Sequence, residues 1–134
     1  MMNRRYMTTK ENNKRKQEHR CHRESNLITL SEKFPDIANI KISYTNQHKS
    51  IFSSRKEKKE RDISPDKLAD FVIDCLNDEC SSFGFDLSDD IYSMRREHKI
   101  ELTNKIDCEG QEAPDHPEQR CGGTLEYTIK ITYK

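Results

Sequence analysis

The chain is short of the residues that build a large hydrophobic core. It has 134 residues with no tryptophan, only 31% hydrophobic residues against 36% charged residues, and a mean hydropathy of −1.09. This length fits one domain with one core, but so polar a composition lies towards the disordered end of the globular range. Apolar burial therefore needs a supplement, for which small domains use a bound metal, disulfides or oligomerisation.

Long apolar segments are also missing. No run approaches the roughly 18–20 apolar residues of a membrane span, and the N-terminal segment has no apolar core of the kind that a secretory signal requires. We therefore expect a cytoplasmic protein that does not enter a membrane. Because thiols stay reduced in the cytosol, its five cysteines indicate metal ligation or chemistry more than a disulfide framework.

Net charge is zero overall, but the 24 basic and 24 acidic residues are unevenly distributed. Residues 1–26 contain eight Lys and Arg against three Glu, a net charge of +5, so residues 27–134 carry −5. The first 26 residues also have no apolar periodicity, which predicts a disordered basic tail ahead of a single domain over residues 27–134. Such an arm could contact the phosphates of nucleic acid or fold back on its own acidic domain.

The apolar pattern of the domain predicts an α+β fold, with a small antiparallel sheet of three to five strands and one helix across it. Alternating apolar residues predict strands around residues 40–44, 100–108 and 125–133. A helix is expected over residues 88–98, because acidic residues follow Ser88, a suitable cap, and basic residues occupy the last turn. Residues 27–34 suggest a short helix that ends before Pro35.

Two charged or ambiguous segments complete the prediction. The run Arg55 to Asp62 interleaves both signs of charge, which is typical of a solvated loop or an exposed edge strand. Residues 64–79 permit two interpretations. Their apolar residues follow helical spacing, yet a helix would place Cys75 and Cys80 about 140° apart around its axis, too far to hold one ion. A short strand over residues 70–74 that ends in a turn at residues 77–78 would bring the two thiols together.

The cysteines form two pairs on this predicted fold. Cys75 and Cys80 flank a turn, whereas Cys108 ends one strand and Cys121 stands just before the last strand. Two cysteine pairs on turns are the construction of a zinc ribbon, in which four thiolates surround a tetrahedral Zn²⁺. The sequence therefore predicts a structural zinc site on Cys75, Cys80, Cys108 and Cys121.

Several neighbouring residues suit a metal site. Gly110, Gly122 and Gly123 would let backbone N–H groups approach the thiolates, and Lys105 or Arg120 could offset the charge of −2 of a Zn(Cys)₄ centre. The spacings are wide for zinc knuckles, and three alternatives stay open. His116 could replace one cysteine as a ligand, the cysteines could be ordinary buried residues, or they could form disulfides whose pairing the sequence does not define.

The segment C-L-N-D-E-C at residues 75–80, followed by G-F-D-L at 84–87, C-E-G at 108–110 and Cys121 before the final strand, resembles a group of small bacterial zinc-ribbon-like proteins. The resemblance covers about residues 68–134. In that group a proline follows the first cysteine and a Gly-Gly pair precedes F-D-L, where this chain has Leu76 and Phe83. The resemblance implies the strand before Cys75 and the metal site, and it carries no established activity.

Other candidate sites are weaker. Cys21 and His22 are adjacent in the basic tail with no partner to orient them, and His98 at the end of the predicted helix suits a dipole contact better than general base catalysis. A Cys₄ site has no open coordination position, so we expect no enzyme. We expect instead a small module that binds nucleic acid through residues 1–26. The alternative is a protein-interaction or inhibitor module that acts through its acidic body.

Overall fold

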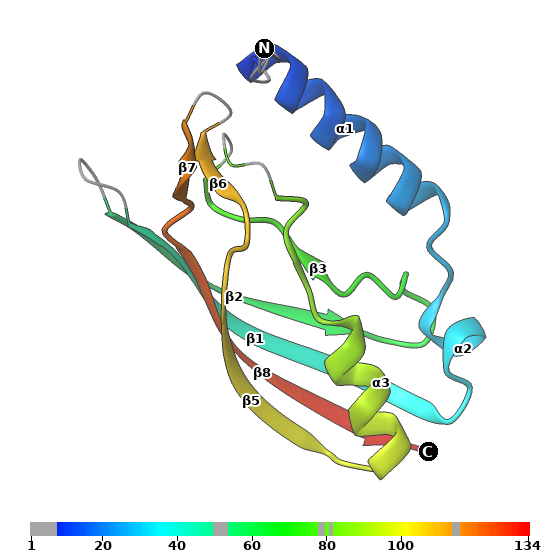
Figure 1. The fold of residues 1–134 in the computed structure, drawn as a ribbon. Coiled ribbons are helices and arrows are strands. Elements are labelled where there is room, and N and C mark those ends of the chain that lie inside the picture. The colour runs from blue at the N-terminus through cyan, green and yellow to red at the C-terminus, as the bar shows by residue number, and fades with distance from the viewer. Residues whose placement is uncertain (1–7, 50–53, 78–79, 81, 114–115) are drawn as a thin grey trace.

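The computed structural model describes residues 8–49, 54–77, 80, 82–113 and 116–134, with the backbone alone described for residues 9, 111–113 and 116–120. A four-stranded antiparallel sheet in the order β2-β1-β8-β5 forms its centre (Figure 1). These strands are β1 (Ile37–Lys49), β2 (Ser54–Ile63), β5 (Glu101–Asp107) and β8 (Gly123–Tyr133). Two further pairs of short strands are β3 (Val72–Ile73) with β4 (Phe85–Asp86), and β6 (Gln111–Ala113) with β7 (His116–Arg120).

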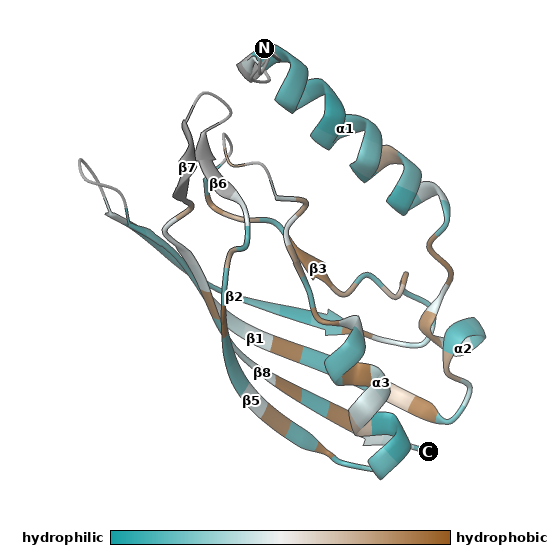
Figure 2. Ribbon diagram, in the orientation of Figure 1, coloured by the Kyte–Doolittle hydropathy of each residue, from teal (hydrophilic) through white to brown (hydrophobic). Residues whose placement is uncertain are grey.

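Alternating side chains give the sheet one apolar and one polar face. The central strands β1 and β8 place Ile40 opposite Ile131 and Ile42 opposite Ile129, and all four side chains are buried. Bands of hydrophobic residues alternate along β1, β8 and β5, whereas β2 is hydrophilic along most of its length (Figure 2). The strand predictions for residues 40–44, 100–108 and 125–133 are confirmed, and the charged run at residues 55–62 is an exposed edge strand.

The predicted helix is present as α3 (Ser88–Glu97), which lies across the apolar face of the sheet (Figure 1). Ile91 and Met94 are fully buried beneath it, and the hydroxyl of Tyr127 on β8 donates to Asp90. The cap differs from the prediction, because Ser88 belongs to the first turn. The Asp86 carboxylate accepts the backbone N–H of Ser88 at 2.9 Å and satisfies a helix N-terminus that has no side-chain cap of its own.

Residues 64–77 follow the strand interpretation, and the predicted turn at residues 77–78 lies partly outside the described residues. Ala69 donates its backbone N–H to Ile28 at 2.8 Å, and Phe71 accepts from Leu87 at 2.9 Å, so this segment pairs with distant parts of the chain and does not form a helix. Phe71 and Ile73 point inward and are nearly fully buried. The short helix predicted within residues 27–34 is also present as α2 (Leu30–Lys33), with the Thr29 hydroxyl as its N-cap. The α+β class is thus confirmed.

The N-terminal segment departs from the predicted disordered tail. Residues 1–7 lie outside the described part of the chain, and the helix α1 (Thr9–Ser25) follows them, capped by the Thr8 hydroxyl. The tail was predicted because it has no apolar periodicity, but polar contacts hold this helix on the body. Among the described residues, no helix has the length and apolar character needed to cross a membrane.

The central strand β8 provides a test of where the core lies. Replacing the fully buried Ile129 by alanine should lower the free energy of unfolding by about 2–5 kcal/mol, because buried apolar atoms are removed and a cavity remains. The control Thr132→Ala lies on the same strand and is exposed, so its effect should stay within about 0.5 kcal/mol. Urea unfolding at fixed metal concentration measures both values. Equal effects would contradict the assignment of the faces.

Candidate metal centre

The ends of the sheet strands and one turn position the four candidate cysteines. Cys75 follows β3, and the backbone N–H of Cys80 donates to the carbonyl of Asn77 at 3.2 Å, which closes the turn between them. Cys108 follows β5 and Cys121 stands between β7 and β8. Two backbone hydrogen bonds fix this second pair, from Cys108 to Gly123 at 2.8 Å and from Cys121 to Gly110 at 2.9 Å.

The four sulfur atoms converge on one point. All four Sγ atoms lie within 4.8 Å of one another, and those of Cys75 and Cys121 are 3.6 Å apart. A tetrahedron with Zn–S bonds of about 2.3 Å has edges of about 3.8 Å, so the cluster needs only a small contraction to enclose an ion. All four residues are buried and none of them forms a disulfide. The chemistry and the geometry of this donor set therefore fit a metal ion.

Mutual contacts shift the pKa values of the thiols in opposite directions. Contact with Cys121 lowers the pKa of Cys108 to about 6, and contact with Cys108 lowers the pKa of Cys80. The pKa values of Cys75 and Cys121 are raised, in both cases mainly by contact with Cys108. Protons on some sulfurs thus stabilise thiolates on the others. A divalent cation would replace those protons and stabilise all four thiolates together.

Side chains and backbone groups surround the cluster and orient it. The Ser82 hydroxyl lies 3.1 Å from the sulfurs of both Cys80 and Cys108, and the Asn77 amide donates to Cys121 at 3.7 Å. The backbone N–H of Gly110 donates to the Cys108 sulfur at 3.4 Å, as predicted for this glycine. Ser82 and Asn77 were missed, because a single hydroxyl or amide near a cysteine has no characteristic spacing in sequence.

The other two predicted glycines act differently. A Cβ atom at Gly123 would lie 2.8 Å from the Cys75 sulfur and 3.4 Å from that of Cys121, so this residue is needed for close packing around the sulfurs. Gly122 accepts a backbone hydrogen bond from Lys49 at 3.1 Å. One glycine therefore contacts a sulfur through its N–H group, another gives the sulfurs space, and the third joins the centre to β1.

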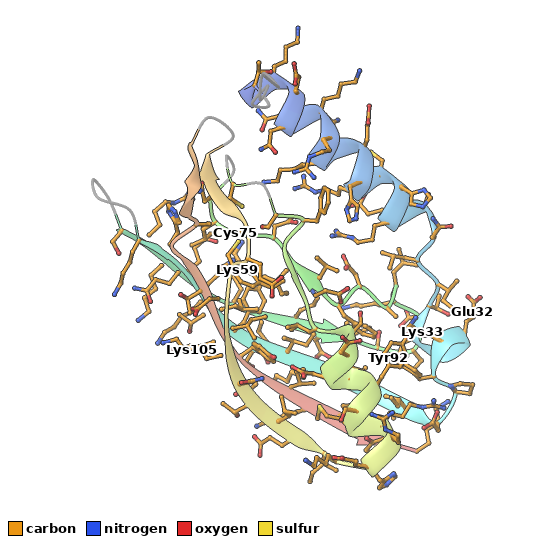
Figure 3. All side chains as sticks on the ribbon, viewed as in Figure 1. Glu32, Lys33, Lys59, Cys75, Tyr92 and Lys105 are labelled. Atoms are coloured by element: carbon orange, nitrogen blue, oxygen red, sulfur yellow. The ribbon has the colours of Figure 1, made fainter. Side chains whose placement is uncertain are left out.

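The predicted counter-charges lie elsewhere. Lys105 is exposed on β5, apart from Cys75 in Figure 3, and its ammonium group lies 3.7 Å from the carboxylate of Glu126. The side chains of Arg120 and His116 fall outside the described residues. Three cationic residues of α1, Lys16, Arg20 and Arg23, line a cavity of about 200 Å³ together with Cys75. Sequence reasoning missed them because α1 was predicted to be disordered.

Polar side chains from β1 and β2 hold the segment that carries Cys75. Arg61 donates to the carbonyls of Asp70 and Val72 at 2.9 and 3.0 Å, the amide of Asn46 donates to Asp74 at 2.7 Å, and Arg55 donates to Leu76 at 3.1 Å. These bonds satisfy carbonyl groups that would otherwise lack a strand partner. These hydrogen bonds add to the burial of Phe71 and Ile73 in fixing the cysteine turn to the main sheet.

The remaining candidates stand apart from the cluster. Cys21 is exposed on α1, one residue from His22, which belongs to the last turn of that helix. His98 has a φ of 56° at the C-terminus of α3 and stacks on Tyr133 with ring centroids 4.0 Å apart. His98 thus lies at the C-terminal end of α3, where the sequence placed it.

Comparisons of the chain with protein-family models, curated proteins and solved structures found no match.

The fifth cysteine provides a matched control for the centre. We expect Cys108→Ser to lose the bound metal, because a hydroxyl is a far weaker ligand than a thiolate, and to lower the unfolding temperature. Cys21→Ser makes the same chemical change on the exposed surface and should keep one metal ion per chain. Inductively coupled plasma mass spectrometry and thermal unfolding measure these outcomes. A folded Cys108→Ser variant with parental metal content would contradict the assignment.

Proposed function

We propose that the four cysteines hold one structural Zn²⁺ ion, and that the protein is a zinc-ribbon-like cytoplasmic module that binds nucleic acid and catalyses no reaction. The convergence of four buried sulfurs carries this proposal. Tetrahedral all-sulfur sites select zinc or iron, and four protein ligands leave a zinc ion without an open position for substrate. The resemblance of residues 68–134 to bacterial zinc-ribbon-like proteins supports the same choice.

The charge of α1 supports nucleic acid as the partner. Thr9–Ser25 contains six Lys and Arg against three Glu, a net charge of +3. Lys10 and Lys14 are exposed one helical turn apart, where both ammonium groups can reach consecutive phosphates. Arg20 pairs with Asp74 at 3.5 Å, but both side chains are about half exposed, so water screens this pair and a phosphate can compete for it.

Charge removal on α1 tests the proposed partner. The double variant Lys10→Gln/Lys14→Gln should bind a single-stranded oligonucleotide more weakly. The dependence of the logarithm of the affinity on the logarithm of salt concentration should become shallower by about 0.7 for each phosphate that the protein no longer neutralises. Lys56→Gln/Lys58→Gln removes the same charge from exposed positions on β2 and should change neither value. Fluorescence anisotropy across a salt series measures both. An unchanged α1 variant would argue against this partner.

A second candidate function follows from a cavity on another side of the cysteine cluster. This cavity, about 590 Å³ in volume, is lined by residues 82–86 and 106–110 together with Asp89. Its lining combines the apolar side chains of Phe83, Phe85 and Ile106 with four carboxylates, and within the described residues it contains no lysine or arginine. The carboxylates are those of Asp86, Asp89, Asp107 and Glu109. Such a surface suits a basic segment of another protein.

Neutralising part of this surface tests the second candidate. Asp107→Asn/Glu109→Gln should weaken the binding of a fluorescent oligo-arginine peptide, because two carboxylates of the cavity lose their charge. The control Glu101→Gln/Glu126→Gln removes the same charge from exposed positions on β5 and β8 and should leave the affinity unchanged. Anisotropy titrations at low salt measure the difference. If both variants weaken binding equally, the peptide responds only to net charge and the cavity is not its site.

A further inference from the structure

The helix α1 is anchored to the cysteine cluster by a buried polar residue. Asn12 is fully buried, and its amide nitrogen donates to the backbone carbonyl of Cys80 at 3.2 Å. The amide oxygen of Asn12 accepts a hydrogen bond from Arg15 at 3.1 Å. A buried carbonyl that loses its donor is costly in free energy, so this contact fixes the N-terminal half of α1 relative to one of the four candidate ligands.

Further contacts hold the same face of α1 on the same segment of the body. The ring of His19 stacks on Phe83 with centroids 3.8 Å apart, and the guanidinium carbon of Arg15 lies 4.4 Å from the centre of that ring. Towards the C-terminal end of α1, Arg20 pairs with Asp74 at 3.5 Å and Arg23 with Asp70 at 3.9 Å. The body's partners in all these contacts lie between residues 70 and 83, the segment that carries Cys75 and Cys80.

The helix depends on this docking for its own stability. α1 has 17 residues of strongly polar sequence, and isolated helices of that length are marginal in water even when they are rich in alanine. Figure 1 shows α1 as a separate rod beside the segment that contains β3, and Figure 2 shows that it is hydrophilic along nearly its whole length. We expect α1 to lose its helical structure when its partners on residues 70–83 lose theirs.

Electrostatics connects α1 to the metal itself. Lys16, Arg20 and Arg23 share a cavity with Cys75, and a zinc ion with four thiolates carries a net charge of −2. That charge attracts the three cations. Lys16 and Arg23 are partly buried, which reduces screening by water, whereas Arg20 is exposed. The cations of α1 therefore lie where the −2 charge of a bound centre would attract them.

From these contacts we propose that metal binding and the docking of α1 are coupled. The bound ion orders the turn between Cys75 and Cys80, and α1 folds against that turn. Loss of the ion releases α1 and frees Arg20 and Arg23 for other anions. Linkage is reciprocal: the factor by which the bound ion strengthens the docking of α1 equals the factor by which docking strengthens the binding of the ion. A variant that undocks α1 must therefore bind the ion more weakly. This inference rests on the proposed metal centre and is independent of nucleic-acid binding.

Two triple variants that each replace one asparagine and two basic residues of α1, one set at anchoring positions and one at exposed positions without these contacts, test the coupling. Asn12→Ala/Arg20→Gln/Arg23→Gln removes the anchors, whereas Lys10→Gln/Asn13→Ala/Lys14→Gln makes equivalent changes at exposed positions. Zinc affinity is measured on the full chain by competition with a chromogenic chelator. We expect the anchor variant to bind zinc at least fivefold more weakly than the parent, at the lower end of typical coupling factors, and the control to match the parent.

Hydrogen exchange followed by mass spectrometry supplies the second measurement. In the zinc-loaded parent the amides of α1 should be protected, and in the zinc-loaded anchor variant they should exchange as in an unfolded chain while β1 and β8 stay protected. Equal zinc affinity in the anchor variant and the control would overturn the coupling, as would unprotected α1 amides in the zinc-loaded parent. A parent that binds no zinc at all would instead overturn the proposed metal centre.

Discussion

The convergence of four sulfur atoms from two separate parts of the chain is the constraint on which one end of the molecule depends. Cys75 and Cys80 lie on a turn that follows β3. Cys108 directly follows β5, and Cys121 lies just before β8. Contact with Cys108 lowers the pKa of Cys80 and raises that of Cys75. The turn that carries these two cysteines, the β6-β7 hairpin and α1 are all arranged around the same point (Figure 1).

The remainder of the fold is held by an ordinary apolar layer, but a thin one. Ile42, Ile129, Ile91 and Met94 are fully buried between the sheet and α3, and this layer covers only one face of the sheet. At the cysteine end, polar groups add to the apolar contacts of buried residues such as Ile73 and Phe85. Arg61 and Asn46 donate to carbonyls of the segment before Cys75, so these carbonyls are matched to partners from distant strands. Such matching explains how a chain with few hydrophobic residues forms an extensive ordered structure.

The elements that could be predicted from sequence are those whose signal is local. The apolar residues of the strand β8 recur every 2 residues, and those of the helix α3 about every 3.6 residues. The four cysteines lie at turns or strand ends, and these positions predicted that they form one cluster. Residues 64–79 were ambiguous, because Phe71 and Cys75 fit helical spacing as well as a strand followed by a turn. The choice depends on hydrogen bonds to Arg61 and Ile28, which no local pattern contains. Ser82 was missed for the same reason, since its role depends on two sulfurs from different segments.

The error at α1 has a separate physical cause and concerns function most directly. Hydrophobic periodicity detects helices that pack through apolar faces, whereas α1 packs through an amide, an imidazole ring and guanidinium groups. A helix held in this way gains little from burial of apolar area, and its charge pairs are partly exposed, so its docking is weak compared with that of α3. Under the proposed coupling, this weak docking makes the basic helix respond to whether a metal ion is bound at the cysteines. The same residues that appeared to form an independent tail are thus the ones that connect the candidate metal centre to the surface.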